Sequence, residues 1–196
     1  METFKFDRKI IYPKDPTASE KRIQQYIGYY GIKYDICKKQ NPKTIVEVGV
    51  RAGYSAWCFL QACPDAHYIG FDANNGTHGG QGGVDGRYFK WAKHILKDYS
   101  HELINLDTQK VQDLNLSNID FFHVDGDHTI EGVQHDLDLA LKSISDTGLI
   151  LIDDITYLDT VTQGVELWLS KNRNLVTNEF IPSLRGEMLI RRKETE

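Results

Sequence analysis

The spacing of apolar residues changes several times between residue 18 and residue 192. Between residues 18 and 39, apolar and aromatic residues recur at intervals of three and four, which predicts a helix that ends at Asn41-Pro42. Short apolar runs predict strands, and segments between and after them return to helical spacing. The predicted strands are 44–48, 67–72, 102–106, 119–124 and 148–153, and the predicted helices are 54–63, 85–99, 129–145 and 161–170.

The alternation of strand and helix predicts an open parallel sheet with helices on both faces, a doubly wound, Rossmann-like α/β fold. The run GLILID (148–153) is continuously apolar, as in strands that are buried on both faces. Two further runs, VTNEFI (176–181) and EMLIRR (187–192), flank a short turn and predict an antiparallel hairpin. We expect one domain over residues 1–196, with an N-terminal helical segment at about 1–42 and the Rossmann-like core at about 43–192.

Composition narrows the class of protein. The chain has 196 residues, of which 40% are hydrophobic and 26% charged, as in folded soluble domains. The net charge of −5 argues against nucleic acid as a partner, and no apolar run is long enough to span a membrane. The charged N-terminus does not resemble a signal peptide, and three cysteines (Cys37, Cys58 and Cys63) form no even disulfide framework. We therefore expect a cytoplasmic protein with reduced thiols.

In open parallel sheets, ligands bind beyond the carboxyl ends of the strands, so the residues there are the candidates for a site. The first strand runs into EVGVRAGYS, which contains Glu47, Gly49, Gly53 and Ser55. Glycines there permit a tight turn and let a ligand approach the N-terminus of the next helix. The spacing E-x-G-x-x-x-G differs from the G-x-G-x-x-G of dinucleotide enzymes. A plain strand-to-helix turn would use the same glycines.

Carboxylates follow the other strands. Asp72 lies about 20 residues beyond the glycine turn, where an acid can hold ribose hydroxyls; an Asx-turn before Asn74 is the alternative. The later strand ends carry Asp107 with Thr108, Asp125, and Asp153 with Asp154. Carboxylates gathered on one rim repel one another unless a cation or a cationic ligand lies among them.

Two other segments leave alternatives open. The glycine-rich stretch 74–87 is either a flap over an active site or a surface insertion, and His78 within it is a weak candidate for a substrate contact. Tyrosines of the first helix either cover a pocket or pair with a second copy of the chain, which would make a homo-oligomer. These are Tyr26, Tyr29, Tyr30 and Tyr34.

The motif EVGVRAGYS, together with FFHVDGDHTIEGVQHDL and the later GLILIDD, resembles the class I S-adenosylmethionine-dependent methyltransferases. Within that class the chain is similar to small metal-dependent O-methyltransferases of the macrolide-sugar and cephalosporin-cluster type. The resemblance covers roughly residues 44 to 192. It implies a strand order of 3-2-1-4-5-7-6, with strand 7 antiparallel.

The resemblance also implies roles for the candidate residues. Glu47 and Gly49, in one motif with Gly53 and Ser55, would lie against the methionine part of S-adenosylmethionine. Asp72 would hold the ribose, Asp107 and Thr108 would lie beside the adenine, and Asp125 would belong to both the cofactor site and the metal site. Asp125, Asp153 and Asp154 would bind Mg²⁺. His128 occupies the position of a lysine base in related enzymes.

These expectations describe one reaction, the transfer of a methyl group to a hydroxyl of a small molecule. Magnesium on oxygen ligands can acidify that hydroxyl, and a histidine can accept its proton. His128 has a simpler alternative role as the cap of the helix that begins at 129. Two other functions remain as alternatives: a dinucleotide-dependent oxidoreductase and a non-catalytic nucleoside-binding protein.

Overall fold

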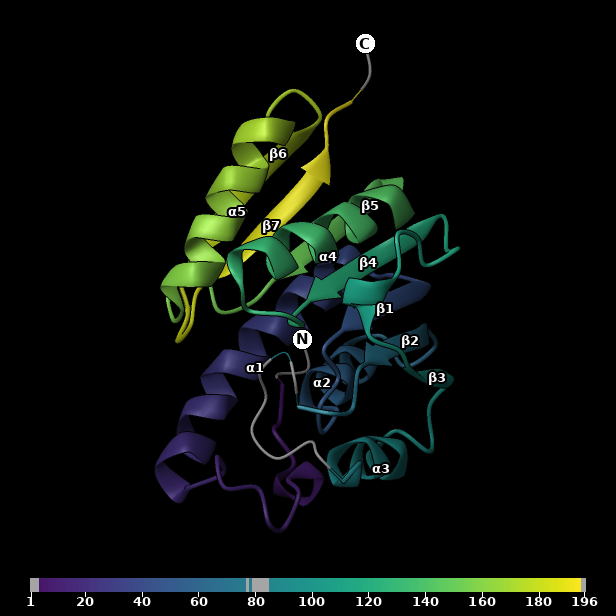
Figure 1. Ribbon diagram of the computed structural model, residues 1–196. Coiled ribbons are helices and arrows are strands. Elements are labelled where there is room, and N and C mark those ends of the chain that lie inside the picture. The colour runs from purple at the N-terminus through teal and green to yellow at the C-terminus, as the bar shows by residue number, and fades with distance from the viewer. Residues whose placement is uncertain (1–3, 77, 79–84, 195–196) are drawn as a thin grey trace.

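The computed structural model describes residues 4–76, 78 and 85–194 of the chain. Helices and strands alternate through most of it (Figure 1). The helices are α1 (Glu20–Gln40), α2 (Tyr54–Ala62), α3 (Arg87–Ile95), α4 (Ile130–Ser143) and α5 (Asp159–Asn172), with 3-10 turns η1 (Arg8–Ile10) and η2 (Thr108–Lys110). The strands are β1 (Thr44–Val48), β2 (His67–Asp72), β3 (His101–Asn105), β4 (Ile119–Val124), β5 (Ile144–Ile152), β6 (Val176–Ile181) and β7 (Glu187–Arg192).

The seven strands form one sheet in the order β3-β2-β1-β4-β5-β7-β6, which confirms the predicted order. The pairs among β1 to β5 are parallel, whereas β7 runs antiparallel to both of its neighbours, β5 and β6. The carboxyl ends of β1, β2, β4 and β5 therefore meet along one edge, where the sequence predicts the site.

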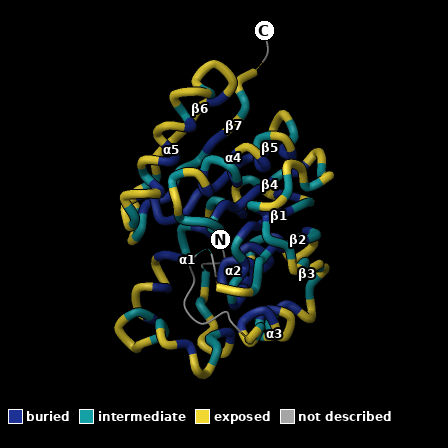
Figure 2. Tube along the Cα trace, viewed as in Figure 1, coloured by how far each residue is buried: buried dark blue, intermediate teal, exposed yellow. Residues whose placement is uncertain are grey.

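Helices cover both faces of this sheet, and its strands are mostly buried (Figure 2). The buried apolar residues form two clusters. Because side chains alternate along a strand, adjacent residues enter different clusters. Ile45 and Phe121 pack with α1 and α2, and their neighbours Val46 and Phe122 pack with α4 and α5. This alternation also decides which polar side chains face α1.

Capping explains where the first helix begins and ends. The Oγ of Ser19 accepts a hydrogen bond from the backbone N of Arg22 at 3.4 Å. At the other end Asn41 adopts a left-handed conformation with φ of 51°, immediately before Pro42. The predicted end at Asn41-Pro42 is confirmed.

Two other predicted boundaries are wrong. The third helix spans Arg87–Ile95 rather than 85–99, because Gly86 has a left-handed φ of 70° and turn structure follows Leu96. The fifth strand starts at Ile144 rather than at 148, because Ile144 pairs with Ile119 across a register shift. The polar residues at this irregular start carried no strand-like alternation.

The segment before α1 is held against the body by a buried carboxylate. Asp15 accepts hydrogen bonds from Arg51 Nη1 and Nη2 at 3.0 and 2.9 Å, and from the hydroxyl of Tyr54 at 2.9 Å. Arg51 and Tyr54 belong to the β1–α2 connection, so this segment closes over the edge of the sheet where the site is expected.

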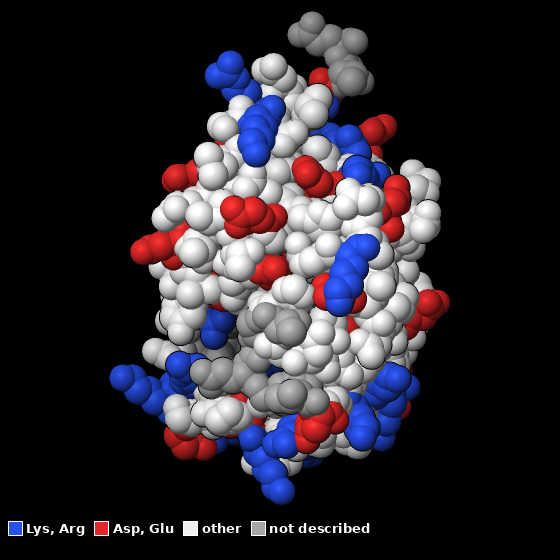
Figure 3. Space-filling view, in the orientation of Figure 1, with Lys and Arg blue, Asp and Glu red and all other residues white. Residues whose placement is uncertain are grey.

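Charges of both signs are interspersed on the face shown in Figure 3, and neither sign gathers into a single patch. Of the helices in the described ranges, none is both long enough and apolar enough to cross a membrane.

Candidate active site

A cavity of about 530 Å³ opens at the carboxyl edge of the sheet, between α1 and the strand ends. Eight of the predicted site residues line it: Gly49, Ser55, Asp72, Asp107, Thr108, Asp125, His128 and Asp154. Three others, Glu47, Gly53 and Asp153, do not line it. Tyr26, Tyr29 and Tyr30 of α1 form part of its wall, so these tyrosines cover the pocket. Pairing with a second copy of the chain stays a prediction.

The two glycines of the first motif, Gly49 and Gly53, are required for different structural reasons. Gly49 has a φ of +92°, and a Cβ atom there would lie 1.8 Å from the carbonyl oxygen of Asp125. Only glycine lets the ends of β1 and β4 approach so closely beside the cavity. Gly53 has a φ of +78° before α2, and a Cβ atom there would lie 2.9 Å from the Cβ of Ala92 in α3. Gly53 therefore serves helix packing.

Asp72, the last residue of β2, is oriented by two backbone donors. Its Oδ2 accepts from the N of Arg51 at 2.7 Å, and its Oδ1 accepts from the N of Asn74 at 2.6 Å. The Asx-turn is thus present. An ionised carboxylate has about four lone-pair sites, so Asp72 retains acceptors for two hydroxyl groups of a ligand.

A second buried carboxylate shapes the wall near Thr108. Asp136 of α4 accepts from the Oγ1 of Thr108 and the Nε2 of Gln109, each at 2.9 Å, and burial raises its pKa to about 6. Asp107, the residue before Thr108, pairs with His78. The Nε2 of His78 lies 3.0 Å from the Oδ1 of Asp107, and its Nδ1 lies 3.0 Å from the Oδ2 of Asp127. His78 thus contacts the wall; residues 77 and 79–84 of the glycine-rich segment lie outside the described residues.

Glu47 is fully buried inside the sheet instead of lying at the cavity. It accepts hydrogen bonds from the hydroxyls of Ser55 and Tyr68 and from the Nδ1 of His123, the last at 2.7 Å. Glu47 and His123 are partners in the β1–β4 register, so both point to the α1 side of the sheet. In this position Glu47 orients Ser55, which does line the cavity.

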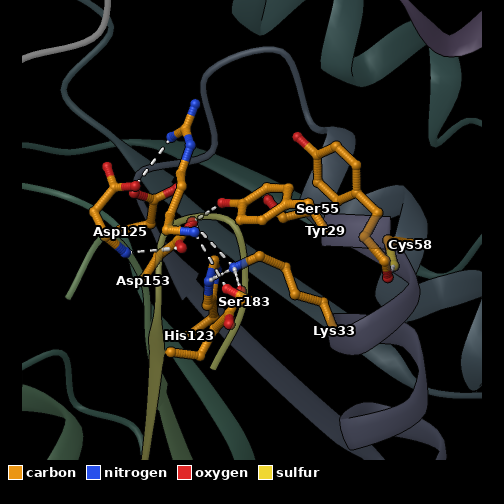
Figure 4. Close-up of polar contacts among 12 residues, drawn as sticks. Tyr29, Lys33, Ser55, Cys58, His123, Asp125, Asp153 and Ser183 are labelled. Carbon is orange, nitrogen blue, oxygen red and sulfur yellow. Dashed lines mark hydrogen bonds and ion pairs between the residues drawn. The ribbon is translucent and has the colours of Figure 1, made fainter. Parts of the chain in front are cut away.

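A buried lysine completes this polar chain (Figure 4). The Nζ of Lys33 lies 3.2 Å from the Nε2 of His123, 3.0 Å from the Oδ2 of Asp153 and 4.0 Å from the Oε1 of Glu187. An ammonium group can only donate, so His123 Nε2 accepts and its Nδ1 carries the proton toward Glu47. Tyr29 also donates its hydroxyl to Asp153.

Charge pairing dominates the ionisation of Lys33 and Asp153. Burial alone would lower the pKa of Lys33, but Asp153 and then Glu187 raise it above its usual value. Burial acts in the opposite direction on Asp153, yet Lys33 holds the pKa of that carboxyl at about 2. Lys33 and Asp153 are therefore both charged at neutral pH and form a buried ion pair between α1 and the end of β5.

Beyond this pair, four polar side chains face the cavity together: Asp125, His128, Asp154 and Arg185. The Nε2 of His128 lies 3.4 Å from the Oδ1 of Asp125 and 3.9 Å from the Oδ2 of Asp154. The Nη1 of Arg185 donates to the Oδ1 of Asp154 at 3.0 Å. The hydrogen bond to Asp125 raises the pKa of His128 to about 9, and burial with the charges of Asp125 and Asp153 raises that of Asp154 to about 6.

Two overlapping groups of side chains could hold a divalent cation here, His123 with Asp125 and Asp153, and Asp125 with His128 and Asp154, and each contains two of the three predicted metal ligands. The carboxylate of Asp153 already pairs with Lys33 and accepts hydrogen bonds from the hydroxyl of Tyr29 and, at 2.8 Å, from the backbone N of Asp154. Asp125, His128 and Asp154 each offer a ligand atom, and these atoms lie within 4.8 Å of one another. Magnesium commonly takes one or two carboxylates and fills its other positions with water and substrate. Asp125 and Asp154 therefore fit such a cation without Asp153.

Two of the residues described above were missed by the sequence analysis. Lys33 lies within the buried stripe of α1, between Tyr30 and Tyr34, and a lysine on that stripe was a usable signal. Arg185 lies in the turn between β6 and β7, where residue spacing gives no indication of a site.

Comparisons with known proteins agree with this geometry. The sequence matches the family described as "Methyltransferase domain" over residues 46–155, more than half of the chain. No curated protein matches it.

Solved structures share the fold at low sequence identity. A Podospora anserina methyltransferase, PaMTH1, bound to SAH, has a TM-score of 0.68 and 16% identity, covering 95% of this chain and 84% of that one. The O-methyltransferase TomG from Streptomyces achromogenes, involved in tomaymycin synthesis and complexed with SAM, has a TM-score of 0.62 and 14% identity, covering 91% and 82%. An O-methyltransferase from Bacillus cereus in complex with SAH has a TM-score of 0.58 and 14% identity, covering 91% and 84%.

The carboxyl-edge cavity, the strand order with β7 antiparallel and the match over residues 46–155 lead to one assignment. The chain belongs to the family of methyltransferase domains.

Proposed function

We propose that this protein transfers a methyl group from S-adenosylmethionine to a hydroxyl of a small molecule, with assistance from magnesium. One observation carries the proposal. A single cavity has Asp72 and Thr108 at one part of its wall and His128 between Asp125 and Asp154 at another. The first group suits a nucleoside, and the second suits the deprotonation of a hydroxyl. The resemblance to TomG and to the Bacillus cereus enzyme, both O-methyltransferases, favours oxygen as the acceptor.

The cofactor would lie along the ends of β1 to β3. Asp72 accepts the two ribose hydroxyls, since its carboxylate is held in place by the backbone of Arg51 and Asn74. Asp107 and Thr108 border the adenine, and Gly49 leaves room for the methionine part. Ser55 offers a hydroxyl oxygen there, because its proton is donated to Glu47.

His128 is the side chain placed to accept the proton of the substrate. Its Nε2 points toward Asp125 and Asp154, and its side chain remains 30% exposed at the cavity. Asp125 and Asp154 would hold the divalent cation, which when bound would acidify a coordinated hydroxyl. Proton acceptance requires the neutral imidazole. A cation bound to Asp125 and Asp154 would offset their negative charge and lower the pKa of His128, which would favour its action as a base.

The test compares Asp154→Asn with Asp146→Asn, a matched change at an exposed carboxylate of β5. SAH binding is measured by calorimetry, and SAH release from SAM is measured with a panel of hydroxylated acceptors, with magnesium or with chelator. We expect Asp154→Asn to remove magnesium-stimulated turnover while SAH affinity is retained, and Asp146→Asn to behave as wild type. Turnover that is unaffected by chelator would contradict the metal assignment. SAH binding without turnover on any acceptor would favour a non-catalytic nucleoside-binding protein.

A further inference from the structure

The cavity contains an arginine that the proposed methyl transfer does not use. Arg185 comes from the turn between β6 and β7, and its guanidinium lies over two aromatic rings. Its Cζ is 5.3 Å from the ring centroid of Tyr29 and 4.9 Å from that of Tyr157. Both rings line the cavity with Arg185. Cation–π contacts with these two rings and one hydrogen bond to Asp154 restrain the guanidinium.

Most of the hydrogen-bonding capacity of this guanidinium is uncommitted. Nη1 donates to Asp154, and across residues 4–76, 78 and 85–194 the Nε and Nη2 atoms have no hydrogen-bond partner. The side chain is 24% exposed, and it borders the cavity. A rigid planar guanidinium with free N–H groups is the side chain best suited to bind a carboxylate or a phosphate through two parallel hydrogen bonds.

The acidic residues nearby leave the Nε and Nη2 edge of this guanidinium open, because Asp125 and Asp153 contact other side chains and Asp154 contacts Nη1. Asp153 pairs with Lys33 at 3.0 Å, and Asp125 contacts His128 at 3.4 Å. Asp154 engages only the Nη1 of Arg185. An anionic group can therefore approach the Nε and Nη2 edge, which none of these three carboxylates contacts.

We propose that Arg185 determines substrate specificity and selects hydroxylated substrates that carry an anionic group, a carboxylate or a phosphate. Arg185 binds that group while the hydroxyl lies toward His128, whose Nε2 is 3.9 Å from the Oδ2 of Asp154, the carboxylate that Arg185 contacts through its other oxygen. Tyr157, whose side chain lies at the surface with 55% exposure, offers a ring face beside the same group, which favours a planar substrate. This inference rests on the proposed methyltransferase function and names the class of its substrate.

The experiment uses four phenols that differ in the charge of the group opposite the hydroxyl. The full chain is first shown to bind SAH by calorimetry; failure at this step would contradict the proposed function and not the role of Arg185. At saturating SAH, ligand-observed NMR then measures the affinity for 4-hydroxybenzoate, 4-hydroxyphenyl phosphate, 4-hydroxybenzyl alcohol and 4-hydroxybenzylamine. The anionic probes should bind about tenfold or more tightly than the neutral alcohol, and the amine should bind most weakly. The stronger of the two anionic probes distinguishes phosphate from carboxylate.

Variants assign that preference to Arg185. Arg185→Gln should reduce the preference for an anion to about twofold or less, since it removes the charged donors. Arg185→Lys should retain part of it, because a lysine keeps the charge but lacks the planar fork. Arg173→Gln, at an exposed arginine beyond α5, is the matched control and should behave as wild type. The ratio of anionic to neutral affinity is the readout, so a general weakening through Asp154 does not affect it. Equal binding of all probes by wild type, or an unchanged preference in Arg185→Gln, would overturn the inference.

Discussion

At the scale of single residues, Asp72 offers the most direct test of the cofactor site. Substitution of Asp72 by Ala should weaken SAH binding by about 1–3 kcal/mol, as expected for the loss of charge-assisted hydrogen bonds. Asp72→Asn keeps one oxygen acceptor and should lose less. Calorimetry with SAH measures both variants. Unchanged affinity in the Ala variant would remove Asp72 from the ribose role.

His128 permits a second residue-scale test that needs no substrate. Because Asp125 raises its pKa to about 9, the imidazole is protonated at neutral pH in the absence of other ligands. A divalent cation on Asp125 and Asp154 would repel that proton, so magnesium should lower the pKa of His128. Histidine-selective NMR titrations with and without magnesium measure the shift. A titration that millimolar magnesium does not move would contradict a cation beside this imidazole.

At the scale of elements, a buried ion pair attaches α1 to the sheet. Lys33→Met would leave the buried carboxylate of Asp153 without its cation, which should lower the free energy of unfolding by about 3–5 kcal/mol. Urea unfolding measures the loss, and Lys39→Met at an exposed position of the same helix is the control. The double variant Lys33→Met, Asp153→Asn should lose less than the sum of the two single variants. Additive losses would mean that the two side chains are not coupled.

The segment before α1 depends on a second pair, and its contribution should vary with pH. Burial alone would raise the pKa of Asp15, but Arg51 and Thr17 hold it below its ordinary value of 3.8. The stabilisation is therefore present above pH 3.8 and is lost as the pH falls through the lowered pKa. Asp15→Asn should lower the free energy of unfolding by about 2–3 kcal/mol at pH 7, less than for a fully enclosed pair because Arg51 is 28% exposed. The difference from wild type should shrink below pH 4, and a constant difference in urea unfolding would exclude this ion pair as the cause.

Elements were easier to predict than contacts between them. The strands and helices of the α/β core follow from periodicity, and the strand order was reached through the family resemblance. The alternation of β1 already puts Glu47 on the same face as Ile45, inside the sheet, although the motif suggested a cavity residue. By the same rule Asp153 shares the α1 side with Leu151, where Lys33 lies. Its partner Lys33 lies in a helix 120 positions earlier in the sequence, and only the folded structure brings the two together. The sequence alone could therefore not distinguish the role of Asp153 from that of Asp154.

At the scale of the whole molecule, the cavity draws on distant parts of the chain. Tyr29 comes from α1, Asp72 from β2, His128 from the loop before α4, and Arg185 from the final hairpin. The sheet edge brings these residues together because its parallel strands end on the same side. A site built in this way requires the complete fold, and local motifs in the sequence identify only part of it.

The position of β7 has a consequence for how this protein is made. The last strand of the chain, Glu187–Arg192, lies between β5 and β6 and not at an edge. During synthesis, β5 is made before β7. The edge of β5 that contains Ile150 and Ile152 therefore has no partner strand until β7 has been made. At about 5–20 residues per second, the stretch from Ile152 to Arg192 takes roughly 2–8 s to translate. Throughout that interval the nascent chain presents an apolar strand that can pair with other chains, so a ribosome that stalls within this stretch would release an aggregation-prone fragment.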